Sequence, residues 1–196
     1  MTSRRNVEDR VLDAAHECVA AFGVRRTTLT DVARRAGVSR PTVYRRWPDV
    51  TSIVGDLLTR ELGMLLDGCI AEAAAGCARE RLVAGGVRLM VRVWEHPLFG
   101  RIIDMEPELL ATYTFHRLGA SQQAVLAVLG PEIAAGQQEG SIRDGDPDGL
   151  ARMVLLVAQS TVLSWRLTTD VFDQDQLTTE LRHLLDAYLR PETESP

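Results

Sequence analysis

Apolar residues recur at the spacing of an α-helix along almost the whole chain, and this periodicity constrains the fold more than any other feature. In the first segment, for example, Val7, Val11, Cys18 and Phe22 follow a 3.6-residue repeat that places them on one face. We find no convincing alternation of apolar and polar residues, which is the pattern of a half-buried strand. The sequence therefore predicts an all-α fold of about nine helices.

Capping residues and helix breakers divide this pattern into elements. Asn6 is expected to cap the first helix and Gly23 to end it. Two short helices follow, at 29–36 and 40–47, with Gly37 between them. Further helices are expected at about 51–75, 78–95, 120–138 (kinked at Gly130–Pro131), 148–167 and 174–189, with short helices within 97–118.

The charge is divided unevenly along the chain. The net charge is −5, yet residues 1–50 carry ten Arg against six acidic residues, and the remaining 146 carry twelve Arg against twenty-one. A basic segment joined to an acidic one is typical of an anion-binding head on a separate body. We expect a helix-turn-helix head at 1–48 and a body at 49–196. On charge alone, a solvated basic face explains the head equally well.

The composition excludes several classes of protein. With 45% hydrophobic residues the chain can bury a core, but no apolar run approaches the roughly 20 residues of a membrane span. Three cysteines without a CxxC motif argue against a disulfide framework and for a reducing compartment. There is no secretory signal, GxSxG motif, P-loop or GxGxxG motif. We expect a cytoplasmic protein that is not an enzyme and that has no cofactor.

The segment 40–47 has the properties of a helix that enters the DNA major groove. Val43 and Trp47 lie four residues apart and share one face, which can pack on the first helix. The polar residues lie on the outward face, and arginine can bind guanine with two hydrogen bonds in the major groove. Hydroxyl groups and helix N-termini commonly bind phosphates. The candidate DNA-binding residues are Thr28, Thr30, Ser39, Arg40, Pro41, Thr42, Tyr44, Arg45 and Arg46.

These candidates have different alternatives. Arg40 and Arg45 are the best candidates for base contacts. Tyr44 is a candidate phosphate contact, although it could instead cover the first helix of the body. Arg46 lies on the flank of the helix, where a phosphate contact, an intramolecular pair and base recognition are all open.

The run from Thr27 to Pro48 resembles the signature of the tetracycline-repressor (TetR) family. The matching features are the Thr27–Thr28 pair, Val32–Ala33, the Ala-Gly-Val-Ser sequence at 36–39, Thr42, Tyr44 and Trp47. The resemblance covers about residues 6–58. One departure is Val50, which stands where many members have a phosphate-binding lysine; Thr51 or a backbone N–H at this helix start is a possible substitute.

The resemblance implies a homodimer that binds a palindromic DNA operator through its two heads. It also implies repression of transcription, and a small-molecule effector that binds in the body and releases the DNA. Ligand-binding candidates in the middle helices are Met90, Trp94, Phe99, Met105, Tyr113, Phe115 and Trp165, with plain core packing as the alternative for each. The aromatic content weakly favours an apolar or mixed effector.

The last two helices are expected to form the dimer interface. The first is apolar on nearly all sides, and the second carries one apolar stripe. The candidate interface residues are Met153, Val157, Thr161, Leu177, Leu181, Leu184, Leu185 and Tyr188. Packing within one subunit is the alternative.

Other functions have less support. The acidic run 144–149 imitates a calcium loop, but its twelfth position is Leu155 instead of a glutamate, so we interpret it as a helix-entry turn. No cysteine and histidine spacing fits a zinc site, and a thiol redox sensor stays open. An α-helical enzyme or ligand carrier, and an architectural DNA-binding protein without an effector, are the alternative functions.

Overall fold

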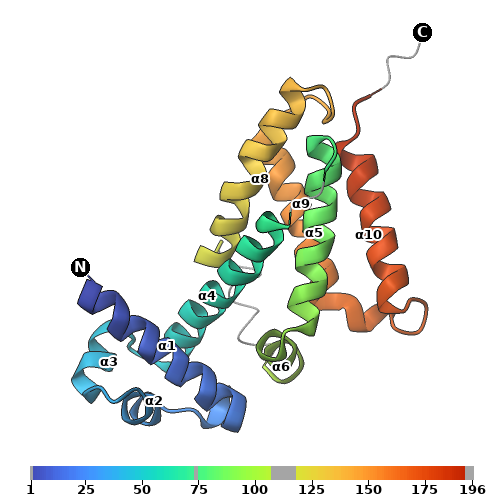
Figure 1. The fold of residues 1–196 in the computed structure, drawn as a ribbon. Coiled ribbons are helices and arrows are strands. Elements are labelled where there is room, and N and C mark those ends of the chain that lie inside the picture. The colour runs from blue at the N-terminus through green and yellow to red at the C-terminus, as the bar shows by residue number, and fades with distance from the viewer. Residues whose placement is uncertain (1, 73–74, 107–117, 193–196) are drawn as a thin grey trace. The chain divides into compact units, whose positions relative to one another are not determined.

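The computed structural model describes residues 2–72, 75–106 and 118–192, with side chains from residue 7 onward. Within these residues the fold is all-α, with nine α-helices, two short 3-10 helices and no strand (Figure 1). The elements are α1 (Thr2–Phe22), η1 (Val24–Arg26), α2 (Leu29–Ala36), α3 (Arg40–Arg46), α4 (Val50–Ala71), α5 (Ala78–Glu95), α6 (Pro97–Met105), α8 (Ala120–Gln138), α9 (Pro147–Ser164), η2 (Trp165–Thr168) and α10 (Gln174–Leu189).

The chain divides into two compact units. The first, which we call the head unit, comprises residues 1–62 and 95–120, and the second, the body unit, comprises 63–94 and 121–196. Helix α4 contributes to both units, and α6 belongs to the head unit. The sequence analysis placed the end of the DNA-binding head at residue 48. That residues 1–48 fold as a domain of their own stays a prediction.

The head unit is built on one apolar core. Helix α1 contributes a stripe that includes Val11, Ala15 and Val19, and Val32 and Val43 join it from α2 and α3. All five side chains are almost completely buried. Leu98 and Ile102 of α6 belong to the same core, which explains why α6 is part of this unit.

Local sequence signals fix the turn between α2 and α3. Thr28 caps α2 by accepting a hydrogen bond from the Asp31 backbone N–H, and Ser39 caps α3 in the same way from Thr42. Gly37 ends α2 in the left-handed conformation, with φ of 64°, which glycine adopts without strain. Pro41 lies in the first turn of α3, where its missing N–H has no intrahelical partner.

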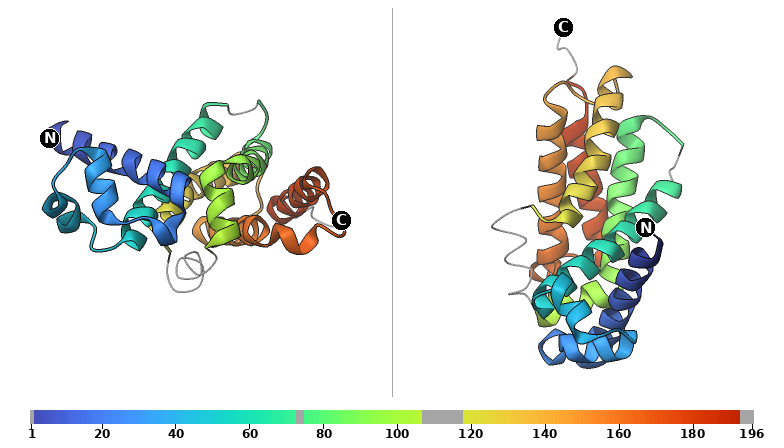
Figure 2. Two further views of the ribbon diagram at one scale, coloured as in Figure 1. Left: turned by 90° about the horizontal axis from the view of Figure 1, so that it is seen from below. Right: turned by 90° about the vertical axis from the view of Figure 1, so that its left-hand side faces the viewer.

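The body unit is a bundle in which α5, α8, α9 and α10 run alongside one another (Figure 2). Its core contains Met90 of α5, Ile133 of α8, Val154 of α9 and Leu185 of α10. Helix α8 approaches its neighbours closely at Gly136, where an added Cβ would lie 2.5 Å from Cδ1 of Ile142 and 3.1 Å from Cβ of Ala78.

Several expected helix boundaries were wrong by a few residues. Helix α1 begins at Thr2, so Asn6 lies inside it and is not its cap. Helix α4 begins at Val50, before the expected Thr51, because Asp49 accepts a hydrogen bond of 2.7 Å from the Ser52 N–H. It ends at Ala71, four residues early.

The expected helix at 148–167 also differs in the structure. Helix α9 begins one residue earlier, at Pro147, and tightens into a 3-10 turn after Ser164.

Helix α8 continues through Pro131 without interruption. No helix in the described parts of the chain is long and apolar enough to cross a membrane.

Candidate DNA-binding helix and effector-binding unit

Helix α3 presents one apolar and one polar face, as its sequence predicts. Val43 is fully buried and Trp47, the C-cap residue, is 3% exposed. On the outward face, Tyr44 is 49% exposed, and Arg40 and Arg45 are also exposed. Tyr44 is therefore half exposed, and both its phosphate contact and its packing against the first helix of the body stay predictions.

The arginines of the head unit fall into two groups. Most are paired: Arg34 with Asp31 at 2.8 Å, Arg35 with Glu17 at 3.3 Å, and Arg25 with Glu106 at 3.1 Å. By contrast, Arg26, Arg40 and Arg45 form no ion pair or hydrogen bond with any residue that the structure describes. The unpaired cations on α3 are therefore the two that the sequence favoured for base contacts.

Arg10 of α1 stabilises the turn between α2 and α3. Its Nη2 donates hydrogen bonds to the carbonyl oxygens of Ala36 at 2.6 Å and Gly37 at 3.4 Å. These carbonyls lie at the C-terminal end of α2, where helix groups lack intrahelical partners and a cation is favourable. Arg10 thus helps to set the orientation of α3, a role that the sequence did not reveal.

Arg46 has partners inside the head unit. Its Nη2 lies 3.1 Å from Oδ2 of Asp56, its Nε lies 3.4 Å from Oε1 of Glu8, and its guanidinium lies 5.3 Å from the centroid of the Trp47 ring. The intramolecular pair, one of the three roles left open for Arg46, is therefore present in the head unit.

The threonines at the start of α2 differ in availability. Thr28 is exposed, but its hydroxyl already donates to Oδ2 of Asp31 at 2.6 Å. Thr30 is partly buried. At the start of α4, the Asp49 carboxylate caps the helix and would repel a phosphate, so this terminus is a poor substitute for the missing lysine.

Comparison with known proteins identifies the family. Residues 11–55 match the model of the bacterial regulatory proteins of the tetR family. An HTH-type transcriptional regulator of Mycobacterium bovis is 42% identical over 186 residues, which cover 95% of this chain and 96% of the relative. The chain belongs to the TetR family.

Solved structures of this family share the fold. The repressor QsdR of R. erythropolis has a TM-score of 0.72 at 17% identity, covering 96% of this chain and 98% of that one. The regulator FadR of Bacillus subtilis, solved in complex with stearoyl-CoA, has a TM-score of 0.64 at 21% identity, covering 92% and 98%. These structures confirm the all-α fold, and the relative at 42% identity confirms the assignment as a TetR-family transcriptional regulator.

The ligand-binding candidates of this TetR-family protein are distributed over both units. Met90, Trp94 and Trp165 belong to the body unit, while Phe99 and Met105 belong to the head unit. Met90 is 2% exposed and lies in the core. Phe99 packs against the core of the head, and Met105 is 66% exposed. The remaining two candidates, Tyr113 and Phe115, lie outside the described residues.

Trp94 and Trp165 are the candidates that the structure brings together. Their ring centroids are 6.0 Å apart, and Trp94 Nε1 donates to the Val162 carbonyl at 3.2 Å. In the same unit, the Gln122 side-chain amide donates a hydrogen bond of 2.5 Å from α8 to the Gln159 amide oxygen on α9. The aromatic pair and the amide pair are both partly buried, which is the mixed polarity expected of a small-molecule site.

The dimer candidates on α9 and α10 divide into buried and exposed residues. Leu181 and Leu185 are 3% and 1% exposed, so they pack within the subunit. Met153 and Leu184 are 46% and 51% exposed. Val157, Thr161, Leu177 and Tyr188 are partly buried.

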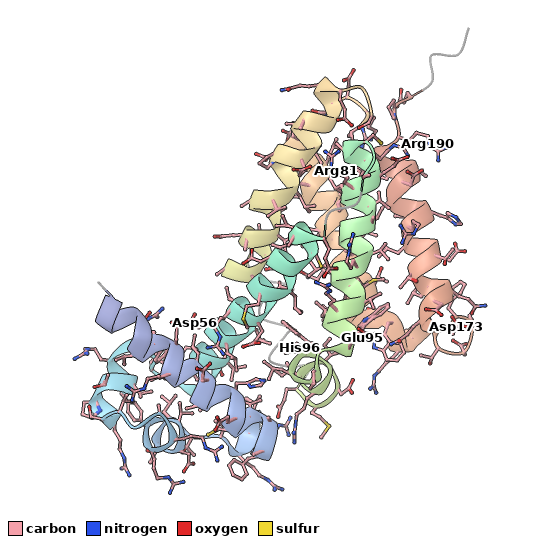
Figure 3. All side chains as sticks on the ribbon, viewed as in Figure 1. Asp56, Arg81, Glu95, His96, Asp173 and Arg190 are labelled. Carbon is pink, nitrogen blue, oxygen red and sulfur yellow. The ribbon has the colours of Figure 1, made fainter. Side chains whose placement is uncertain are left out.

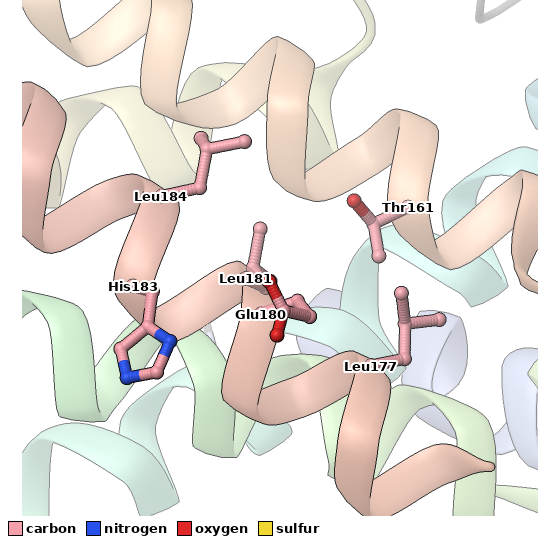
Figure 4. Close-up of a pocket in the computed structure, with 6 residues that line it drawn as sticks. All are labelled: Thr161, Leu177, Glu180, Leu181, His183 and Leu184. Carbon is pink, nitrogen blue, oxygen red and sulfur yellow. The ribbon is translucent and has the colours of Figure 1, made fainter. Parts of the chain in front are cut away.

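A shallow hollow lies between α9 and α10 among these residues. It is lined by Thr161 of α9 and by Leu177, Glu180, Leu181, His183 and Leu184 of α10 (Figure 4). Four of the eight interface candidates therefore line one surface depression, a juxtaposition that the sequence did not reveal.

Two of the three cysteines, Cys18 and Cys69, are buried. Burial raises the pKa of the Cys18 thiol, and it raises that of Cys69 even though Arg92 opposes the shift. A raised thiol pKa disfavours the reactive thiolate. Asp146 caps α9 through a 3.0 Å hydrogen bond from the Gly149 N–H, which confirms the helix-entry turn. The described residues contain no group of three or more potential metal ligands.

Proposed function

We propose that this chain is a ligand-responsive repressor that binds a palindromic DNA operator as a homodimer. Helix α3 of each subunit enters the major groove, where Arg40 and Arg45 contact bases and Thr42 and Tyr44 contact phosphates. The observation that carries this proposal is the presence of unpaired, exposed arginines on α3, beside other head arginines that pair with carboxylates. A free guanidinium can form two hydrogen bonds with guanine without first losing an ion pair.

The dimer would be formed by the exposed apolar residues of α9 and α10. Contiguous exposed apolar surface on a soluble protein commonly marks an interaction site. Two-fold symmetry would place the two α3 helices on successive major-groove turns, about 34 Å apart, and each protomer would contact one half of a palindrome. Leu184 and Met153 supply the exposed apolar surface, and the hollow beside Leu184 offers a complementary recess.

The effector would bind in the body unit near Trp94, Trp165 and the Gln122–Gln159 pair. An apolar wall with one amide pair suits a ligand that has a long apolar part and a polar group. The stearoyl-CoA bound by the B. subtilis regulator has this character, and acyl-CoA thioesters are therefore the first effectors to test. Release of DNA requires that the effector bind the non-binding conformation more tightly.

A mobility-shift assay on the chain's own promoter region tests the proposal. We expect a sequence-specific complex that survives excess competitor DNA and that weakens as the salt concentration rises, because cations compete with the protein for the phosphates. Addition of the correct effector should release the DNA. Equal affinity for the promoter and for random DNA would contradict operator recognition, and a specific complex that no acyl-CoA or other small molecule releases would contradict effector control.

A further inference from the structure

A carboxylate on α4, that of Asp56, binds two residues at the C-terminal end of α3. Oδ2 of Asp56 accepts a hydrogen bond from the Trp47 indole Nε1 at 2.9 Å and lies 3.1 Å from Nη2 of Arg46. Asp56 lies on α4, within the segment that belongs to the head unit (Figure 3). The Nε atom of the same Arg46 side chain lies 3.4 Å from Oε1 of Glu8 on α1.

The two bonds to Asp56 differ in strength. The Trp47 ring is buried, so its N–H loses water and needs an acceptor, and a charged acceptor makes a stronger hydrogen bond than a neutral one. The ion pair with Arg46 is about half exposed, where solvent screens most of the attraction. The hydrogen bond to Trp47 is therefore the main attachment, and Arg46 completes it.

Helix α3 needs this kind of attachment. It has seven residues, and a helix of that length is marginal in water without tertiary contacts. Ser39 caps the N-terminal end of α3, and Val43 packs the middle of the helix into the core of the head. Asp56 provides the polar contact that fixes its C-terminal end, next to the outward-facing Arg45.

We propose that Arg46, Trp47 and Asp56 form a latch that holds the DNA-recognition helix on α4, and that Arg46 is a positioning residue instead of a phosphate contact. The proposal rests on the proposed function of α3 in DNA binding. Two carboxylates neutralise the Arg46 charge, and a phosphate would have to displace both of them.

The two possible roles of Arg46 predict different salt dependences. Removing one phosphate-binding cation reduces the slope of log Kd against log salt by about 0.9. A phosphate-binding Arg46 would thus lower the slope by about 1.8 in a dimer when it is replaced by glutamine. A positioning Arg46 would weaken binding while leaving the slope unchanged.

Asp56 distinguishes the roles in a second way. If Asp56 only restrained a phosphate-binding Arg46, Asp56→Ala would free that charge and tighten binding to DNA. If the latch positions α3, Asp56→Ala should weaken specific binding by about tenfold, because the buried indole N–H loses its acceptor. Asp56→Asn keeps an acceptor oxygen and should restore most of the affinity.

The experiment measures operator affinity by fluorescence anisotropy at several salt concentrations, for the full-length wild type, Asp56→Ala, Asp56→Asn and Arg46→Gln. Asp67→Asn is the matched control, since Asp67 is an exposed carboxylate on the same helix without a partner among the described residues. We expect Asp56→Ala to bind the operator about tenfold more weakly and Asp56→Asn to recover most of the affinity. The slope of log Kd against log salt should be the same for Arg46→Gln as for the wild type, and Asp67→Asn should bind like the wild type. Tighter or unchanged binding by Asp56→Ala, or a lower slope for Arg46→Gln, would overturn the latch.

A measurement on the free protein separates the latch from the function on which it rests. The Trp47 indole proton, assigned by its loss in Trp47→Phe, should exchange with solvent at least about tenfold faster in Asp56→Ala than in the wild type or Asp56→Asn. Unchanged exchange would refute the latch even if the protein bound no operator. Absence of operator binding with faster exchange would refute the proposed function alone.

Discussion

Replacing Leu184 with glutamate tests the dimer interface with little effect on the subunit itself. Leu184 is 51% exposed on α10, whereas Leu181, one turn earlier on the same helix, is 3% exposed. A charge at position 184 remains in water in the monomer, so the fold should tolerate it. In the proposed dimer the same side chain is buried against the partner.

The magnitude follows from the exposed fraction. Full burial of a leucine side chain contributes roughly 1.5–3 kcal/mol, so the exposed half represents about 1 kcal/mol per subunit. An interface with two-fold symmetry contains the residue twice, which doubles this to about 2 kcal/mol. Burying two unpaired carboxylates costs several kcal/mol more. A total above about 4 kcal/mol weakens dimerisation by about a thousandfold.

Sedimentation velocity at micromolar concentration measures this effect, with circular dichroism to confirm that the fold is intact. We expect Leu184→Glu to be a folded monomer. Leu167→Glu is the matched control, because Leu167 is 82% exposed in η2 and outside the predicted interface, and it should remain dimeric. Leu181→Glu should instead unfold the body. A dimeric Leu184→Glu would refute the interface.

Three further predictions concern DNA selectivity, pH and packing. Arg45→Ala should weaken operator binding by about 1–3 kcal/mol and relax selectivity at one base pair per half-site, measured against a set of single-base operator variants. Asp186→Asn should lower the melting temperature at pH 7, because a hydrogen bond from Arg190 lowers the pKa of Asp186. This contribution is present above the unfolded-state pKa and is lost as the pH falls through the folded-state pKa, so the difference from the wild type should shrink in acid. Gly136→Ala should lower the free energy of unfolding by about 1–3 kcal/mol in chemical denaturation, because the added Cβ would meet neighbouring side chains. Gly85→Ala is the matched control on α5: an added Cβ there has nothing within 4 Å, so this variant should raise the free energy of unfolding by about 0.5–1 kcal/mol.

The sequence predicted the elements whose signals are local. Gly37, Ser39 and Pro41 determine where α2 ends and α3 begins, and these positions lie within a few residues of one another. The spacing of Val43 and Trp47 correctly predicted the buried face of α3. By contrast, Asp49 at the start of α4 was missed, although its spacing to Ser52 is that of a helix cap.

Contacts between distant residues could not be predicted in this way. Arg10 lies 26 residues from the Ala36 carbonyl that it binds, and nothing in its neighbourhood distinguishes it from other surface arginines. Asp56 is equally inconspicuous, although it fixes both Arg46 and Trp47. Both roles arise from the packing of α1 and α4 against the helix-turn-helix, which is a tertiary property.

Periodicity also could not separate the two sides of α10. Leu181 and Leu184 belong to one apolar stripe in the sequence, yet one is buried in the subunit and the other is half exposed. The apolar stripe of α10 is wider than the surface that packs against the rest of the subunit, so it contains both buried and exposed leucines. Only the packed structure shows which leucines are buried. For the same reason, the sequence could not show how deeply Met90 is buried, and its role in the ligand site stays a prediction.

Footprinting of the promoter region tests the central claim, that α3 of each protomer binds the major groove of an operator. We expect two protected half-sites related by two-fold symmetry, with centres about 10 base pairs or a multiple of that apart, and loss of both in the Arg40→Ala, Arg45→Ala double variant. A footprint that is unchanged in that variant, or protection without half-site symmetry, would contradict it.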